Sequence, residues 1–183
     1  FYELKGKRLN FEDFVAVSDV LRPEAPRAIR AALKAGVSVR MITGDHFETA
    51  YQIGHQLGMV KDRDEVFDCR QMNTLTDEQL DPIVERTKVF SRVVPEQKYR
   101  LLTILKKHHI TAMTGDGVND VPALSNAHIG VAMGSGSHIA RDAGAIILLD
   151  DNFKTIIDAM REGRTIIANV RRMLFYLLST NTG

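Results

Sequence analysis

A group of carboxylate and amide side chains follows the apolar segment at residues 110–113. Asp116 lies between two glycines, and Asn119 and Asp120 come shortly after it. The apolar segment predicts a buried strand, and open α/β sheets bind ligands at the carboxyl ends of their strands. Two neighbouring carboxylates repel each other unless a cation lies nearby. Because Mg2+ prefers oxygen ligands and keeps several waters, the segment predicts a Mg2+ site with Asp116 as its best candidate ligand.

A second loop contains the groups that a phosphoryl anion requires. Thr43, Gly44 and Asp45 follow a predicted strand at residues 37–42. Gly44 lets the backbone approach an anion, the N–H groups at the start of the next helix point toward it, and Thr43 adds a hydroxyl donor. Lys98 lies in the first turns of another predicted helix and can supply positive charge, although most lysines on helices are simply exposed.

Segments of strand length alternate with segments of helical periodicity along most of the chain. Strands are expected at residues 14–17, 37–42, 89–90, 110–113, 129–133 and 145–149. Residues 61–75 are charged and irregular, which indicates a connection or an exposed edge. Strands that alternate with helices predict an α/β fold with a Rossmann-like parallel sheet and helices on both faces. In such a sheet, the loops at Thr43 and Asp116 meet along one edge.

The composition is that of a soluble globular domain. Of the 183 residues, 44% are apolar and 26% are charged. The formal net charge of +1 gives no electrostatic basis for binding nucleic acid. The single cysteine, Cys69, excludes an internal disulfide. The chain begins at Phe1 and stops soon after the apolar residues 173–178, without a signal peptide or a complete membrane span, so we expect a piece of a longer protein.

Several motifs together resemble one known family. Residues 113–124 read Met-Thr-Gly-Asp-Gly-Val-Asn-Asp-Val-Pro-Ala-Leu and resemble the hinge motif of P-type ion-transporting ATPases, which are members of the haloacid dehalogenase-like superfamily. Residues 41–45, 89–98 and 129–134 match further motifs in the family's order, and the likeness runs from about Val15 to the last residue. Several ordered motifs are more specific than any one of them.

The resemblance implies roles for individual residues. It makes Lys98, Asp116, Asn119 and Asp120 catalytic, with Asp116 binding Mg2+ and Asp120 orienting Lys98 or a metal-bound water. The phosphate-binding positions are Thr43 and Gly44, and the nucleotide-binding positions are Asp45 and Arg92. Asp19 and Arg22 match the family's hinge segment, but a loop ion pair explains them equally well.

The resemblance also implies an organisation. Residues 1–151 resemble the second half of a phosphorylation domain, and residues 152–183 resemble a stalk helix that leads into a membrane helix, closest to the type II branch that includes calcium pumps. The family's nucleophile is the aspartate of an Asp-Lys-Thr-Gly-Thr motif on the central strand, and this motif does not occur here. We therefore expect the fragment to lack that strand and to be inactive alone. The implied partners are ATP, a transported cation and a membrane, which the domain approaches from its cytoplasmic face.

The absent strand has a structural consequence. The strands that end at Ile42 and Met113 should flank it, so each would expose unpaired backbone groups. The isolated fragment is then expected either to pair these two strands directly or to borrow a strand from a second copy, as a homodimer.

Three alternatives compete with the pump interpretation. A soluble Mg2+-dependent phosphatase of the same superfamily would share both loops but would not need the basic, apolar-ended last helix. A dinucleotide-binding module is suggested by the glycines at residues 133–140, but the third glycine of that motif is absent. A non-catalytic interaction module is the third class.

Overall fold

The computed structural model describes residues 2–5, 8–11 and 21–181. The strand expected at residues 14–17 and the candidate Asp19 lie outside these residues. The strands are β1 Tyr2–Lys5, β2 Arg8–Phe11, β3 Met41–Ile42, β4 Val66–Asp68, β5 Val89–Ser91, β6 Ala112–Gly115, β7 Ile129–Met133 and β8 Ile146–Leu148. The α-helices are α1 Ala25–Lys34, α2 Phe47–Gln56, α3 Asp77–Arg86, α4 Pro95–Lys106, α5 Val121–Asn126, α6 His138–Ala143 and α7 Phe153–Asn181. Short 3-10 helices are η1 Arg63–Glu65, η2 Cys69–Thr74 and η3 Val118–Asp120.

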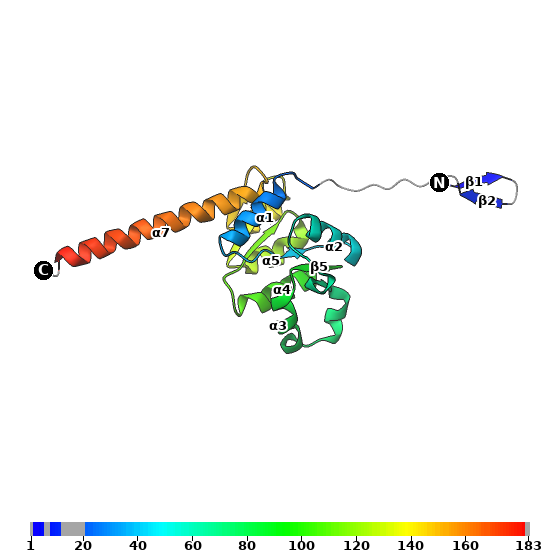
Figure 1. Ribbon diagram of the computed structural model, residues 1–183, viewed down its shortest axis with the longest axis horizontal. Helices are drawn as coiled ribbons and strands as arrows, with labels where there is room; N and C mark the ends of the chain where they lie inside the picture. The colour runs from blue at the N-terminus through cyan, green and yellow to red at the C-terminus, as the bar shows by residue number, and fades with distance from the viewer. Residues whose placement is uncertain (1, 6–7, 12–20, 182–183) are drawn as a thin grey trace.

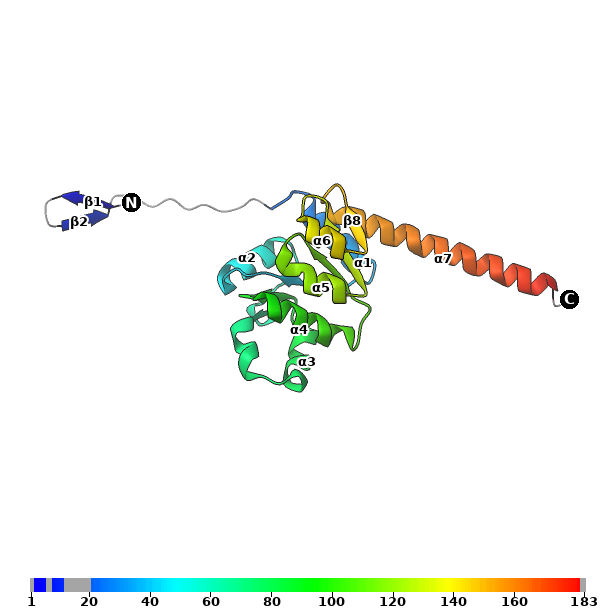
Figure 2. The ribbon, with the colours of Figure 1, turned by 180° about the vertical axis from the view of Figure 1, so that it is seen from behind.

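Two three-stranded parallel sheets form the body of the molecule. The first has the order β3-β5-β4 and the second the order β6-β7-β8, while β1 and β2 pair as an antiparallel hairpin. Helices α5 and α6 pack on β7 and face the viewer in Figure 2, whereas α1 faces the viewer in Figure 1 and packs against α7. The predicted α/β fold with parallel strands and flanking helices is confirmed.

The strands β3 and β6 lie at the edges of separate sheets, so the expectation that they pair directly is wrong. Each has one partner strand among the described residues, β5 for β3 and β7 for β6. Helix α4 belongs to the core of the first sheet and packs against α5 and η3, which follow β6. Helix packing therefore joins the two sheets, and no strand pairing between them is required.

The position of β6 at an edge also corrects its expected burial. Ile110 is 82% exposed, and Ala112 and Thr114 are exposed as well. An apolar sequence predicts burial only where a neighbouring element covers it, and β6 has a partner strand on one side only within the described chain.

The local signals place most helices correctly. Thr76 caps α3 through a reciprocal pair of hydrogen bonds with Gln79, as its sequence predicts. Gly36 ends α1 with a φ of 77°, a conformation that glycine adopts without strain. The segment at residues 61–75 differs from expectation because it contains β4 and η2, whose residues Val66 and Cys69 are buried.

The core consists of two clusters on either side of β5. One lies between β5, α3 and α4, and its fully buried members are Cys69, Met72, Leu80, Val84, Phe90, Leu101 and Ile104. The other packs α1 and α2 against the strands, and its buried members are Ile29, Ala50, Leu57, Met59, Val60, Val66 and Val89. Strand β5 contributes Phe90 to the first cluster and Val89 to the second. The residues that follow it, beginning with Arg92, are therefore attached to a strand that is packed on both faces.

Helix α7 packs on the body through its N-terminal half, where Arg164 Nη1 donates to the Ala35 carbonyl oxygen at 2.7 Å. Asn152 Oδ1 accepts a hydrogen bond from the Lys154 amide at 2.9 Å, and Ile157 is 4% exposed. Farther along, Ile167 is 62% exposed, and the helix extends away from the sheets in Figure 1. In the part of the chain that the structure describes, no helix is long and apolar enough to cross a bilayer.

Candidate functional site

An ion pair joins α4 to the loop after β6. Lys98 Nζ donates to Asp120 Oδ1 at 2.7 Å, and the two side chains are 20% and 9% exposed. Asp120 Oδ2 also accepts from the Gly117 amide at 3.3 Å. Lys98 is therefore not a solvated helix lysine. Its ammonium lies at the Gly-Asp-Gly turn and contacts Asp120. This is the kind of contact that the family resemblance implies for Asp120, which was expected to orient Lys98 or a metal-bound water.

Gly115 is required by the space around Asp120. A Cβ atom at position 115 would lie 2.5 Å from Asp120 Cβ and 2.8 Å from its Cγ. Real Cβ atoms do not approach so closely, so a side chain at Gly115 would displace the carboxylate that binds Lys98. By contrast, a Cβ atom at Gly44 would meet Val93 O at an ordinary 3.8 Å, so Gly44 is not required by space.

Asp116 presents its carboxylate to solvent while its backbone is fixed. Its carbonyl oxygen accepts from the Ser137 amide at 2.8 Å, and the side chains of Asp116 and Asn119 are exposed. A Cβ atom at Gly136 would lie 2.8 Å from Asp116 O, so the loop after β7 packs closely on this turn.

The oxygen donors around Asp116 fit Mg2+. No three histidine, cysteine or acidic side chains are grouped to hold a metal ion anywhere in the described ranges. Mg2+ does not require such a group, because it commonly binds one or two carboxylates and keeps several waters. An exposed carboxylate at Asp116, with the Asn119 amide in the same turn, meets that requirement. Asp120 is already engaged by Lys98, which leaves Asp116 as the candidate ligand.

The Thr43–Asp45 loop is closed by its own side chains. Thr43 Oγ1 donates to Asp45 Oδ2 at 2.7 Å and accepts from the Asp45 amide at 3.1 Å. The loop is attached to the segment before α4, since the Val93 amide donates to Thr43 O at 3.0 Å. The Thr43 loop is therefore attached to Val93, just before α4. The Asp116 turn is attached to Lys98, near the start of the same helix.

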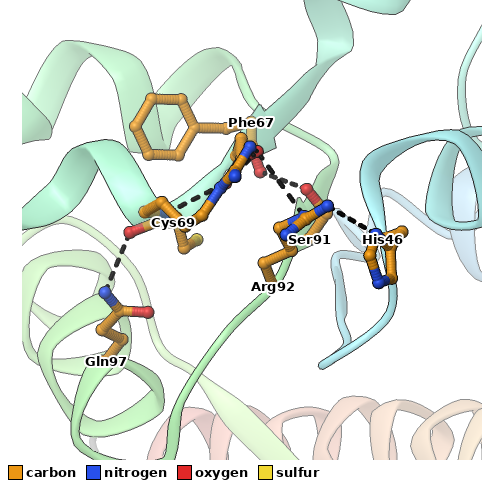
Figure 3. A network of polar contacts seen from close by, with 8 residues as sticks. His46, Phe67, Cys69, Ser91, Arg92 and Gln97 are labelled. Atoms are coloured by element: carbon orange, nitrogen blue, oxygen red, sulfur yellow. Dashed lines mark hydrogen bonds and ion pairs between the residues drawn. The ribbon is translucent and has the colours of Figure 1, made fainter.

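Arg92 lies between the Thr43–Asp45 loop and the end of β4 (Figure 3). Its Nη2 contacts His46 Nδ1, and its Nε lies 3.9 Å from Asp68 Oδ2. The sequence singled out Arg92 and Asp45 but missed His46 and Asp68. His46 directly follows the Thr-Gly-Asp motif, so its position was a usable signal, whereas Asp68 lay in a segment that gave no strand pattern.

The hinge candidate Arg22 contacts the start of α7. Its Nη1 donates to the Asp151 carbonyl oxygen at 2.7 Å. This bond is to a main-chain oxygen, and the alternative of a loop ion pair with Asp19 lies outside the described residues.

The chain is similar in sequence to cation-transporting ATPases. It is 42% identical over 183 residues to a calcium-transporting ATPase of Bacillus subtilis, with 99% of this chain and 21% of that protein covered. It is 43% identical over 178 residues to the calcium-transporting ATPase lmo0841 of Listeria monocytogenes, covering 94% and 20%. It is 46% identical over 168 residues to the cation-transporting ATPase pma1 of Synechocystis, covering 90% and 19%. The chain thus spans about a fifth of the length of these relatives.

Solved structures of related ATPases share the fold. A zinc-transporting PIB-type ATPase in its E2.Pi state superposes with a TM-score of 0.65 at 28% identity, covering 84% of this chain and 21% of that chain. The catalytic domain of the CPx-ATPase CopB-B gives a TM-score of 0.59 at 25% identity, covering 78% and 46%.

Two family models, both described as haloacid dehalogenase-like hydrolase, match residues 3–128 and residues 100–160. The chain therefore belongs to the haloacid dehalogenase-like hydrolase family.

Proposed function

We propose that this chain is the part of an ATP-driven cation pump that holds the phosphoryl group transferred from ATP. The observation that supports this most directly is the Lys98–Asp120 pair, which places a partly buried ammonium beside the Asp116 turn. The 42–46% identity to calcium- and cation-transporting ATPases supports the pump over a soluble phosphatase of the same family. Calcium is the first candidate for the cation, because two of these relatives are named for it.

The roles follow from the chemistry of the side chains. Phosphoryl transfer needs positioning and stabilisation of charge on the phosphoryl oxygens. Lys98 supplies a fixed positive charge, and Asp120 holds its ammonium in place. Asp116 would hold Mg2+, which when bound neutralises charge on the phosphoryl oxygens, and Asn119 would hydrogen-bond a phosphate oxygen or a metal-bound water. Thr43 and Gly44 would bind phosphate oxygens. To do so, the Thr43 hydroxyl would exchange its hydrogen bond to Asp45 for one to the anion.

The nucleophile is an aspartate that we place on a further strand, beside the edges of β3 and β6 that have no partner strand within the described ranges. The fragment alone is then unable to form a phosphoenzyme, although it retains the surrounding site. Asp45 and Arg92 would contact the nucleotide. The membrane lies beyond α7, whose basic residues Arg171 and Arg172 precede the exposed apolar residues 173–178, and the domain occupies its cytoplasmic side.

Two measurements on the fragment test this proposal. Incubation with γ-labelled ATP and Mg2+ should leave no acid-stable label, and a stable label would contradict the assignment of the nucleophile. Titration with Mg2+, followed by amide chemical shifts, should shift the signals of residues 115–120. The change Asp116→Asn should abolish the response, whereas Asp64→Asn, which neutralises an exposed carboxylate in η1, should preserve it. An unchanged response in Asp116→Asn would favour a non-catalytic interaction module.

Among the described residues, β3 and β6 each have an edge without a partner strand, which also supports a strand-borrowing homodimer as the state of the isolated fragment. Multi-angle light scattering at increasing protein concentration should reveal a dimer. A mass that stays monomeric would rule out the exchange of strands.

A further inference from the structure

Arg92 has a strained backbone at the centre of the nucleotide-side loop. Its φ is 54°, and Asp151 is the other described non-glycine residue with a positive φ. A non-glycine residue in this region is strained and persists where the surroundings impose it. Here the Arg92 amide donates to Asp45 O at 2.9 Å, and the next amide, of Val93, donates to Thr43 O. These two hydrogen bonds fasten the Thr43–Asp45 loop to the end of β5 and hold Arg92 in its positive-φ conformation.

The guanidinium of Arg92 is held from two sides. Its Nη2 contacts His46 Nδ1 on one side, and its Nε faces Asp68 Oδ2 at 3.9 Å on the other (Figure 3). The Nε atom is buried without a hydrogen-bond partner, while the side chain as a whole is 30% exposed. A buried donor without an acceptor is costly, so its retention needs an explanation. The contacts orient the guanidinium without satisfying all of its donors.

Asp68 is a fixed negative charge behind Arg92. Arg70 Nε donates to the two carboxylate oxygens at 3.0 and 3.1 Å, Arg70 Nη2 donates at 2.6 Å, and the Arg70 amide donates at 3.1 Å. These hydrogen bonds, with a smaller contribution from the charge of Arg92, hold the pKa of Asp68 below its usual value. Because the carboxylate is ionised and immobile, Arg92 is attracted to one defined point.

His46 contributes an acceptor. A guanidinium can only donate, so the contact requires a neutral His46 ring with its proton on Nε2. The acidic neighbours of His46 in sequence have other partners: the Asp45 carboxylate accepts from Thr43 within its own loop, and Glu48 is paired with Arg63 at 2.6 Å. His46 is thus available to hold Arg92.

We propose that Asp68 and His46 are positioning residues for Arg92, fixing its guanidinium so that the exposed part of the side chain meets an oxygen of the phosphate-bearing ligand. This inference rests on the proposed function for the identity of the ligand, which is ATP. Neither Asp68 nor His46 touches the ligand. Both residues act through Arg92, so they position the ligand-binding side chain and do not bind the ligand themselves.

The first test measures the order of the Arg92 side chain without any ligand. In the 15N-labelled fragment at about pH 7.5, the Arg92 Nε–H signal should be resolved and rigid by heteronuclear relaxation. It should become mobile or disappear in Asp68→Asn and in His46→Ala. It should be unchanged in Asp64→Asn and in His55→Ala, which alter an exposed carboxylate and an exposed histidine elsewhere. A rigid Arg92 signal in both Asp68→Asn and His46→Ala would overturn the proposal.

The second test measures ATP affinity. Removing a negative charge should by itself strengthen the binding of an anion, and Asp64→Asn measures that effect. Asp68→Asn should instead weaken ATP binding about fivefold, the loss expected for one displaced hydrogen bond to a charged group. In a protein that already carries Arg92→Gln, adding Asp68→Asn should cause no further loss of ATP affinity. Equal affinities for Asp68→Asn and Asp64→Asn would overturn the proposal. If the unmodified fragment binds no ATP although Asp68→Asn still mobilises Arg92, then the ligand assignment fails and the positioning role stands.

Discussion

Lys98 Nζ lies 2.7 Å from Asp120 Oδ1, and this contact ties the helix of one sheet to the loop of the other. Helix α4 packs within the first core cluster, whereas Asp120 follows β6 of the second sheet. The pair therefore contributes to the packing of the two halves as well as to the charge of the site.

Breaking this pair should destabilise the fold. Replacing Asp120 with Asn leaves a largely buried ammonium without its counter-charge, and we expect a loss of about 1–3 kcal/mol in the free energy of unfolding. Urea unfolding of Asp120→Asn, Lys98→Met and the double variant measures the coupling between the two side chains. The exposed pair between Lys154 and Asp158 is the control, and breaking it should cost only about 0.3–0.5 kcal/mol. Additive losses at Lys98 and Asp120 would show that the two groups do not interact.

Gly115 should be intolerant of even one methyl group. In Gly115→Ala the new Cβ would lie 2.5 Å from Asp120 Cβ, so the carboxylate must move away from Lys98. We expect a loss of about 1–3 kcal/mol, as for other overpacking substitutions. Gly163→Ala in α7 is the matched control, because nothing lies within 4 Å of its Cβ position, and it should stabilise the helix by about 0.5–1 kcal/mol. Thermal unfolding compares the two, and equal melting temperatures would contradict the steric argument.

Sequence patterns were sufficient where a local signal and the tertiary environment agreed. The helix at α4 could be predicted from Pro95 and from the periodic leucines, and Leu101 and Leu102 are indeed buried. The contact of Lys98 with Asp120 agrees with the expectation that Lys98 reaches this turn, although the single sheet on which that expectation relied is divided into two. Where burial depended on a neighbouring element, as at Ile110, the apolar pattern misled, because a strand at a sheet edge is covered on fewer sides.

The network around Arg92 could not be predicted from local patterns. Asp68 meets Arg92 because β4 pairs with β5 in register, Asp68 opposite Ser91. That pairing depends on β4, a strand of three residues in which two apolar residues precede Asp68. A strand this short shows no periodicity from which it could be predicted. Long-range register, rather than residue type, creates this part of the candidate site.

Cys69 should be inert in the folded protein and should make stability fall at alkaline pH. Burial raises the pKa of the Cys69 thiol to about 12, with a further contribution from Asp68. In the unfolded chain the thiol ionises near its ordinary pKa of about 8.5. The folded state then keeps a proton that the unfolded state has lost, so stability is complete below the unfolded pKa and declines as pH rises toward about 12. Cys69→Ala should flatten this decline in urea unfolding measured at successive pH values, and a thiol reagent should react with Cys69 only on unfolding. Rapid reaction with the native protein would contradict its burial.

Arg40 should stabilise the C-terminal end of α3 through its guanidinium. Its Nη2 donates to Glu85 O at 2.9 Å, and its Nη1 contacts the carbonyl oxygens of Val84 and Thr87. These are carbonyls that the end of a helix leaves without partners, and a cation there also interacts favourably with the helix dipole. Because burial lowers the pKa of Arg40, the side chain is held in place at a desolvation cost that its hydrogen bonds must exceed.

Replacing Arg40 with Met keeps much of the aliphatic packing and removes every donor, so we expect a loss of about 1–3 kcal/mol. Arg40→Lys restores the charge but not the forked geometry, and its loss should be intermediate. Arg30→Met on the exposed face of α1 is the control for charge and should change stability by no more than about 0.5 kcal/mol. Hydrogen exchange should localise the Arg40→Met effect to the last turn of α3. If Arg40→Met and Arg30→Met unfold at the same urea concentration, then the contacts of Arg40 with α3 do not contribute to stability.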